Sequence, residues 1–284
     1  MRVANLAGRA VLLVADGALD VHKASGGLFG PDPQELYARW DELRAWEARG
    51  EASAEPQPYD AADLGPAVPA PRQVFAIGVN YREHAAESNI DVSERPPWPP
   101  TFTKFPSCLA GPHVQVTLPD GLVDWEVELV VVIGRRTGRV TAAGAWGHVA
   151  GLTVGQDLSE RITQLSGPVP QQYSLGKSYP GFGPIGPAVV TLDDLGDPDD
   201  LRIGCELNGE TMQDARTSEM IFSVPELVER LSAVAPLLPG DVIFTGTPAG
   251  IGGTRTPPRF LEAGDELVSR IEGLGTLRTT FKGA

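Results

Sequence analysis

Three acidic residues alternate along one short segment of the chain. Asp124, Glu126 and Glu128 lie two positions apart, and the apolar run from Leu129 to Ile133 follows them. On an extended strand their side chains would project to the same side. Carboxylates this close repel one another and are costly to bury, and a bound divalent cation removes that cost. Oxygen ligands favour Mg²⁺ or Mn²⁺, with Ca²⁺ as an alternative, over Zn²⁺. Judged on spacing alone, an edge strand with a solvated acidic face is the better explanation.

A fourth acid, Asp157, ends a second strand-like run that begins at Val149. A polar segment containing Arg161 and Gln164 comes next, and Lys177 follows within Leu-Gly-Lys-Ser-Tyr. Taken alone, Asp157 is better explained as the N-cap of a helix, and a lone lysine is normally solvated. These residues become candidates for a site only in combination with the glutamates.

The elements that must position these residues are mostly strands. The run from Leu129 to Ile133 is short and wholly apolar, which predicts a strand buried on both faces. One helix is clear, because Ser223 and Glu226 have capping-box spacing and Pro236 ends the pattern. The chain therefore predicts a mostly β fold with some α (α+β), rather than alternating βαβ units. Strands are expected over residues 74–78, 126–134, 188–191, 201–207, 241–244 and 266–271.

The first 48 residues predict a separate compact unit. Val11 to Val14 is typical of a short strand, and a helix is expected from Pro33 to Glu47, with Asp32 as its cap. Residues 49–72 are rich in Ala, Pro, Gly and acidic side chains, which is typical of a linker. We therefore expect a small N-terminal domain with its linker over residues 1–72 and a catalytic domain over residues 73–284.

The overall composition excludes several classes of function. The formal charge of −14 argues against nucleic-acid partners, since phosphate binding needs clustered Lys and Arg. No apolar run is long enough to cross a bilayer, and the first residues do not resemble a signal peptide. Only two cysteines are present, Cys108 and Cys205, so a reducing cytoplasm is the expected location. An acidic protein that binds an anionic substrate needs local positive charge from placed side chains or a metal.

Five segments carry recognisable motifs: GVNYREHAAE at 78–87, DWEVE at 124–128, DLSER at 157–161, GKS at 176–178 and GTPAG at 246–250. Together and in this order, they resemble the fumarylacetoacetate hydrolase family. Residues 208–214 and 257–265 are further similar to bacterial members of an acylpyruvase and 2,4-diketo-3-deoxy sugar acid hydrolase branch. The resemblance covers most of residues 73–284 and implies a β-rich roll or sandwich that forms a homodimer.

The resemblance assigns roles to individual residues. It implies that Glu126, Glu128 and Asp157 are the ligands of a divalent metal ion. Lys177 is implied as a catalytic cation beside the metal, where it would hold substrate oxygens. Gln164 and Thr247 match positions that contact substrate in the family.

A His-x-x-Glu pair completes the implied site. His84 and Glu87 match the pair of the smaller bacterial-type members, and their spacing places both on one side of a helical turn. There Glu87 would orient His84 for acid–base catalysis. The alternative for His84 is a surface histidine on a mobile loop. Arg161 is expected to be a structural partner of the acidic cluster and is left out of the catalytic set.

Three departures from the family pattern affect the substrate more than the metal. Gln156 precedes Asp157 where Asn or His is more usual, and Tyr179-Pro-Gly follows the Lys-Ser pair where many members have Asp-Thr. The segment from Ile90 to Pro100, after the His-x-x-Glu pair, is rich in proline.

The resemblance implies chemistry on a small anionic 2-oxo acid. We expect hydrolysis of a C–C bond in an acylpyruvate or 2,4-dioxo acid through an enolate that the metal stabilises. The alternative is decarboxylation or keto–enol tautomerisation of an oxaloacetate-like acid, which passes through the same enolate. A third, less favoured hypothesis is a non-catalytic ligand-binding or scaffold protein with the same fold.

Overall fold

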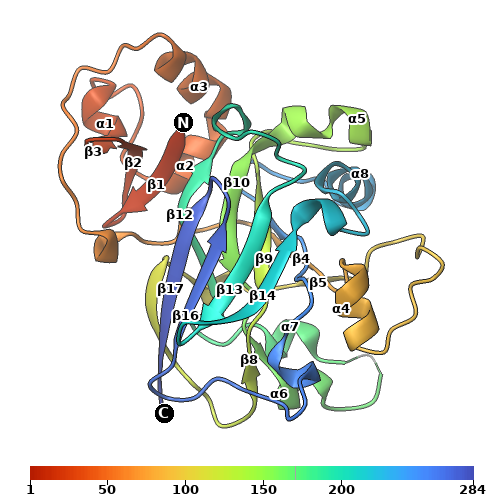
Figure 1. The fold of residues 1–284 in the computed structure, drawn as a ribbon. Coiled ribbons are helices and arrows are strands. Elements are labelled where there is room, and N and C mark those ends of the chain that lie inside the picture. Colours follow the sequence, from red (N-terminus) through yellow and green to blue (C-terminus); the bar gives the residue numbers. More distant parts are fainter. Residues whose placement is uncertain (170) are drawn as a thin grey trace.

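The computed structural model describes residues 1–169 and 171–284, and it consists of two facing sheets with short helices around them (Figure 1). The larger sheet has ten strands, and β6 (Leu109–Ala110) pairs with one of them, β12, outside the main order. The main order is β3 (Gly17–Asp20), β2 (Arg9–Val14), β1 (Arg2–Leu6), β12 (Gly183–Val190), β10 (Val149–Gln156), β9 (Val127–Ile133), β15 (Val242–Phe244), β4 (Val74–Ile77) and β5 (Thr101–Thr103).

The second sheet has five strands, and a two-stranded ribbon lies apart from both sheets. The order of the second sheet is β14 (Glu210–Arg216), β13 (Arg202–Leu207), β16 (Glu266–Ile271), β17 (Gly275–Lys282) and β7 (His113–Thr117). The ribbon pairs β8 (Val123–Asp124) with β11 (Ser159–Glu160). The helices are α1 (Val21–Ala24), α2 (Pro33–Ala38), α3 (Trp40–Ala48), α4 (Arg82–Glu87), α5 (Ala142–Ala145), α6 (Arg161–Leu165), α7 (Tyr173–Gly176) and α8 (Val224–Val234).

Strand β9 contributes to the two larger hydrophobic cores. Leu129, Val131 and Ile133 face the core shared with the second sheet and α8, whereas Val130 and Val132 face the core under α2 and α3. Every residue of β9 is buried, which confirms the predicted strand buried on both faces. A mixed fold of sheets with a few helices, as predicted, therefore supports one central strand from both sides.

Most expected elements are present with small shifts at their ends. The strand predicted over residues 266–271 matches β16, and the capping box of Ser223 and Glu226 begins α8. The single helix predicted from Pro33 to Glu47 is wrong, because the chain breaks at Arg39, which has φ −120° and ψ 30°. The change of direction between α2 and α3 allows Tyr37 and Trp40 both to be buried, and their rings stack with centroids 5.5 Å apart.

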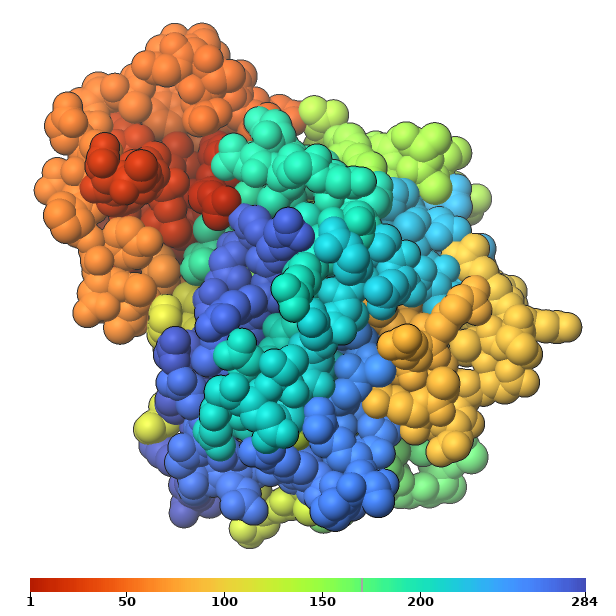
Figure 2. All heavy atoms as spheres, in the orientation of Figure 1, coloured from red at the N-terminus to blue at the C-terminus, as the bar shows by residue number. Residues whose placement is uncertain are grey.

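The N-terminal residues extend the main sheet. Strand β1 pairs antiparallel with β12, and β2 and β3 continue outward from it. Residues 1–60 form a lobe at one side of the molecule, opposite α4 and the segment after it (Figures 1 and 2). In the expected linker, residues 49–72, the backbone is held at Ser53, Gln57 and Gly65 by bonds to Ala24, Ala18 and Asn5. No helix of the described residues is long and apolar enough to cross a membrane.

Candidate metal centre and catalytic cavity

Antiparallel pairing of β9 with β10 brings the distant acids together. Glu126 directly precedes β9, and Asp157 directly follows β10, whose last residue Gln156 pairs with Val127. The backbone N–H of Asp157 donates to the carbonyl oxygen of Glu126 over 2.9 Å. Glu128 lies one strand repeat further along β9 and projects to the same side as Glu126, as the two-residue spacing predicts. Two strand ends thus form one acidic site.

Glu126, Glu128 and Asp157 fit a hard divalent cation. One carboxylate oxygen from each lies within 4.8 Å of the others, and all three residues are buried. Burial, together with the charges of Asp157 and Glu126, raises the pKa of Glu128 well above its usual value. Burial also opposes the charge on Glu126, but nearby Lys177, Arg161 and His84 outweigh it and lower its pKa to about 2. A cluster of three carboxylates supplies the oxygen donors that Mg²⁺ and Mn²⁺ prefer.

Two buried lysines contact this acidic cluster. The Nζ atom of Lys177 lies 2.7 Å from Glu126 Oε2 and 2.6 Å from Asp157 Oδ2. Burial lowers the pKa of Lys177, but the charges of Asp157 and Glu126 outweigh burial and raise it. The second lysine, Lys104, donates to Asp157 Oδ1 over 2.6 Å. We did not predict Lys104, because a single lysine after the short segment Thr-Phe-Thr carries no pattern that distinguishes it from a solvated one.

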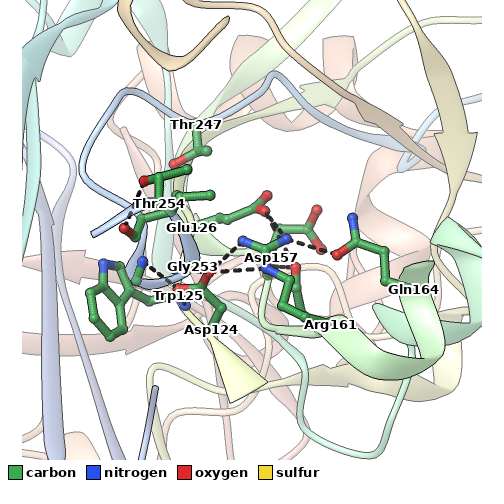
Figure 3. A network of polar contacts seen from close by, with 12 residues as sticks. Asp124, Trp125, Glu126, Asp157, Arg161, Gln164, Thr247, Gly253 and Thr254 are labelled. Carbon is green, nitrogen blue, oxygen red and sulfur yellow. Dashed lines mark hydrogen bonds and ion pairs between the residues drawn. The ribbon is translucent and has the colours of Figure 1, made fainter. Parts of the chain in front are cut away.

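Arg161 connects the cluster to a neighbouring loop (Figure 3). Its guanidinium donates to Asp124 Oδ2 over 2.7 and 3.0 Å and lies 2.8 Å from Glu126 Oε1. The Asp124 carboxylate also accepts from the backbone N–H groups of Gly252 and Gly253. Asp124 is therefore turned toward Arg161 and this loop instead of joining the metal-binding triad. The arrangement agrees with a structural role for Arg161, although its side chain also lines the cavity described next.

A cavity of about 860 Å³ opens beside the cluster. His84 and Glu87 on α4 line it, and His84 Nδ1 lies 2.7 Å from Glu87 Oε1. Since a carboxylate can only accept, Nδ1 is the donor, and in the neutral ring Nε2 keeps a lone pair that can take a proton. Glu87 is itself held by the backbone N–H of Gly250 and the hydroxyl of Thr254. His84 is 7% exposed, which contradicts a surface histidine on a mobile loop.

The two predicted substrate contacts also line the cavity, but they differ in what they can offer. Gln164 accepts from Arg161 through its Oε1, and its NH₂ group has no partner among the described residues. The Thr247 hydroxyl donates to the Val127 carbonyl and accepts from Gln213, so its proton is already committed. Gln164 can donate to a substrate oxygen, whereas Thr247 can only accept through its remaining lone pair.

The departures from the family pattern have clear structural roles. Gln156 accepts from the backbone N–H of Glu126 and donates to Ser269 on β16. These two bonds connect the start of β9 to the second sheet. The hydroxyl of Tyr179 bonds to that of Thr163 on α6. In the proline-rich segment, Arg95 pairs with Glu226 at the start of α8. None of these three side chains replaces a member of the acidic cluster.

Comparison with known proteins agrees with this geometry. Residues 73–282 match the family described as fumarylacetoacetate (FAA) hydrolase C-terminal. The mitochondrial oxaloacetate tautomerase FAHD2A of Bos taurus is 46% identical over 209 residues, which make up 73% of this chain and 65% of that protein. The chain thus spans slightly less than two thirds of the length of this curated relative.

Solved structures extend the likeness to the whole chain. A Mycobacterium smegmatis protein provisionally named HpcE has a TM-score of 0.95 and 53% identity, with full coverage of both chains. A maleylpyruvate hydrolase from Sphingobium sp. SYK-6, solved with manganese(II) and pyruvate, has a TM-score of 0.80 and 27% identity over both full chains. The family match over residues 73–282, joined to this fold, shows that the chain belongs to the fumarylacetoacetate hydrolase family.

Proposed function

We propose that this protein is a divalent-metal-dependent enzyme that moves a proton at carbon 3 of a small 2-oxo acid, and that its reaction is keto–enol tautomerisation of an oxaloacetate-like substrate. One observation carries the proposal: the His84–Glu87 pair lines the same cavity as Lys177 and Glu126, the member of the carboxylate cluster that reaches its wall. Enolisation needs a base that removes the proton and a positive charge that stabilises the enolate oxygen.

The chain's own residues account for the proton transfer. A cation held by Glu126, Glu128 and Asp157 would act as a Lewis acid toward the substrate's oxygens. His84 accepts a proton from carbon 3 at Nε2, and the hydrogen bond to Glu87 stabilises the imidazolium that forms. Negative charge then develops on the 2-oxo oxygen, close to the Lys177 ammonium. Return of the proton to that oxygen completes the enol, and the same steps in reverse form the ketone.

The relatives support tautomerisation over the hydrolysis that the sequence favoured. Proteins named oxaloacetate tautomerase are 40–46% identical to this chain over the catalytic region, whereas the maleylpyruvate hydrolase is 27% identical. Because the chain covers only 65% of the first of these relatives, their activity comes to this protein as a proposal.

Hydrolysis of an acylpyruvate is the second candidate, and the cavity wall favours it. A volume of about 860 Å³ exceeds the needs of a four-carbon acid, and much of the lining is apolar. In this reaction His84 would take a proton from water, which attacks the 4-carbonyl, and the bond between carbons 3 and 4 breaks. The electrons of that bond form the pyruvate enolate, which is then protonated at carbon 3. The apolar residues include Ile90, Phe102, Leu122, Ile162, Leu165 and Phe260.

One substrate panel tests both candidates. The purified protein is mixed with Mg²⁺ or Mn²⁺ and given oxaloacetate in its enol form, then acylpyruvates of increasing acyl length. Faster decay of the enol absorbance without CO₂ release supports tautomerisation. Loss of the diketone absorbance with release of the free acid supports hydrolysis, and CO₂ release supports decarboxylation. Inactivity toward every substrate would overturn the proposal and favour a non-catalytic protein.

The assembly and the location of the protein can be tested separately from its reaction. We propose a homodimer, as the resemblance implies, which light scattering of the purified protein can test. The cytoplasm remains a prediction from the two cysteines, both of which are free and buried. The curated FAHD2A and FAHD2B relatives of cattle and humans are named mitochondrial, so fractionation of the source cells must decide the compartment.

A further inference from the structure

Lys104 is the most deeply buried cation of the site, and its donors are fully used. It is 1% exposed, and its Nζ donates to Asp157 Oδ1, to the carbonyl of Lys177 and to the carbonyl of Phe182 over 3.2 Å. A lysine ammonium has three donors, and here each has an acceptor. None remains for a substrate, and Lys104 does not line the cavity. Its function must therefore be exerted through other residues.

The contacts of Lys104 join two segments that carry the site. Asp157 follows β10, and Lys177 follows α7. The next residue repeats the connection, because the backbone N–H of Phe105 donates to the hydroxyl of Ser178 over 2.9 Å. Lys104 thereby leaves Asp157 Oδ2 to Lys177, whose Nζ lies 2.6 Å away, and holds the backbone that positions Lys177. These contacts alone would fit a residue that only holds the segments after β10 and α7 together.

The charge balance of the cluster points to more than a tie. Four carboxylates, on Asp124, Glu126, Glu128 and Asp157, face three cations, on Lys104, Lys177 and Arg161. With every group ionised, as a bound cation requires of Glu128, one negative charge is in excess. A bound dication would change this to an excess of one positive charge, which suits a carboxylate ligand. Without Lys104, the loaded cluster would be neutral before any anion arrives.

We infer that Lys104 is a positioning residue that also sets the charge of the metal centre, so that the cation-loaded site attracts an anionic acid in a protein of net charge −14. The inference rests on the metal site of the proposed function but not on which reaction follows. It predicts opposite effects for two ligands. Removing the ammonium makes the site more negative, which favours the metal ion and disfavours the anion. A lost structural tie would instead weaken the binding of both.

The test uses Lys104→Met, which removes the charge and keeps a side chain of similar length. Binding of Mn²⁺ to the metal-free protein and of oxalate to the Mn²⁺-saturated protein is measured by titration calorimetry, with no turnover involved. We expect Mn²⁺ to bind about threefold to tenfold more tightly and oxalate about tenfold or more weakly than in the wild type. The unpaired Asp157 is expected to lower the melting temperature of the metal-free variant, and Mn²⁺ should restore more of it than in the wild type.

Two further variants keep the test decisive. Cys108→Ala removes buried volume next to Lys104, since a Cβ at Gly183 would meet both side chains, but it changes no charge. It should leave both affinities near the wild-type values. Lys104→Gln retains a donor for the two carbonyls and serves if the methionine variant does not fold. Weaker binding of both ligands, or no change in either, would overturn the inference. Wild-type protein that binds neither Mn²⁺ nor oxalate would overturn the metal site itself.

Discussion

The carboxylate side of the cavity and the His84 side are held in different ways. Glu126 and Asp157 lie at the ends of two paired central strands, and their side chains contact buried cations. His84 and Glu87 lie on α4, a helix of six residues. Among the described residues, the hydrogen bonds of the Glu87 carboxylate beyond His84 reach one loop, at Gly250 and Thr254. The sheet thus positions the charged cluster, whereas the pair proposed to transfer the proton lies on a short peripheral helix.

Removing one carboxylate of the proposed metal site should have the largest effect on activity. Glu126→Gln keeps the shape of the side chain but removes one metal ligand and one partner of Lys177. We expect metal-dependent activity to fall by about a factor of 10³ or more, because the Lewis-acid contribution is lost. The measurement is turnover at increasing Mn²⁺, with circular dichroism to show that the fold is retained. Wild-type turnover in this variant would remove Glu126 from the ligand set.

Removing the His84 imidazole should lower turnover but leave metal binding unchanged. His84→Ala is expected to lower turnover by about 10²–10⁴-fold, the usual contribution of a general base. Mn²⁺ affinity should remain close to the wild type, because His84 is not one of the three residues proposed as metal ligands. His22→Ala, far from the cavity, is the matched control. An unchanged rate would assign proton transfer to another residue.

The His84–Glu87 contact can be tested through its pH dependence. Burial raises the pKa of Glu87, but hydrogen bonds from His84 and Gly250 outweigh burial and place it below the usual value of 4.5. A depressed pKa in the folded state means that the ionised carboxylate stabilises the fold above that value. This stabilisation is lost as the pH falls through the folded-state pKa. Glu87→Gln should therefore lower the melting temperature at neutral pH and reduce its decline in acid.

Glu87→Gln should also reduce turnover, by less than His84→Ala does. The carbonyl oxygen of the glutamine amide can still accept from Nδ1, but the amide carries no charge to stabilise the imidazolium. We therefore expect a decrease of about tenfold to a hundredfold. An acid decline of the melting temperature identical to that of the wild type would show that another carboxylate is responsible for it.

The smallest effect should come from the segment that follows α4. Arg95 pairs with Glu226 over 2.8 Å, and its guanidinium lies 4.3 Å from the centroid of the Phe222 ring. Because the pair is partly exposed, Arg95→Ala should cost about 1 kcal/mol of stability or less. If this segment helps to hold α4 over the cavity, KM should rise about twofold to fivefold with kcat little changed. Arg82→Ala, on α4 itself and also exposed, is a useful comparison.

Local spacing predicted part of the site, and long-range pairing determined the rest. Glu126 and Glu128 share one side because side chains alternate along extended backbone, and the alternation holds from Glu126, directly before β9, into the strand. Alternation does not extend back to Asp124, because it lies in β8, a separate short strand paired with β11. Asp157 joined the set only through the family resemblance, since nothing local shows that β10 pairs with β9. Lys104 is missed because two of its three partners are backbone carbonyls far along the chain.

The fold was predicted in the same uneven way. Apolar runs and capping residues located the strands and α8, because these signals act over a few neighbouring residues. The break at Arg39 was not predicted, since the apolar spacing of Leu36, Trp40 and Leu43 fits one continuous helix. Burial of Tyr37 against Trp40, which depends on the sheet below, decided against that continuous helix.

The pairing of β1 with β12 protects this chain from aggregation through an exposed sheet edge. Backbone groups along an unpaired outer strand can recruit strands from other molecules. Arg2 and Val3 pair with Val190 and Val189 and so cover the edge of β12. Strands β2 and β3 follow, so the exposed edge of the sheet lies at β3, away from the strands that lead to the metal centre. A shortened chain that begins at residue 73 would expose the border of β12, and we expect it to aggregate even with every residue of the catalytic site intact.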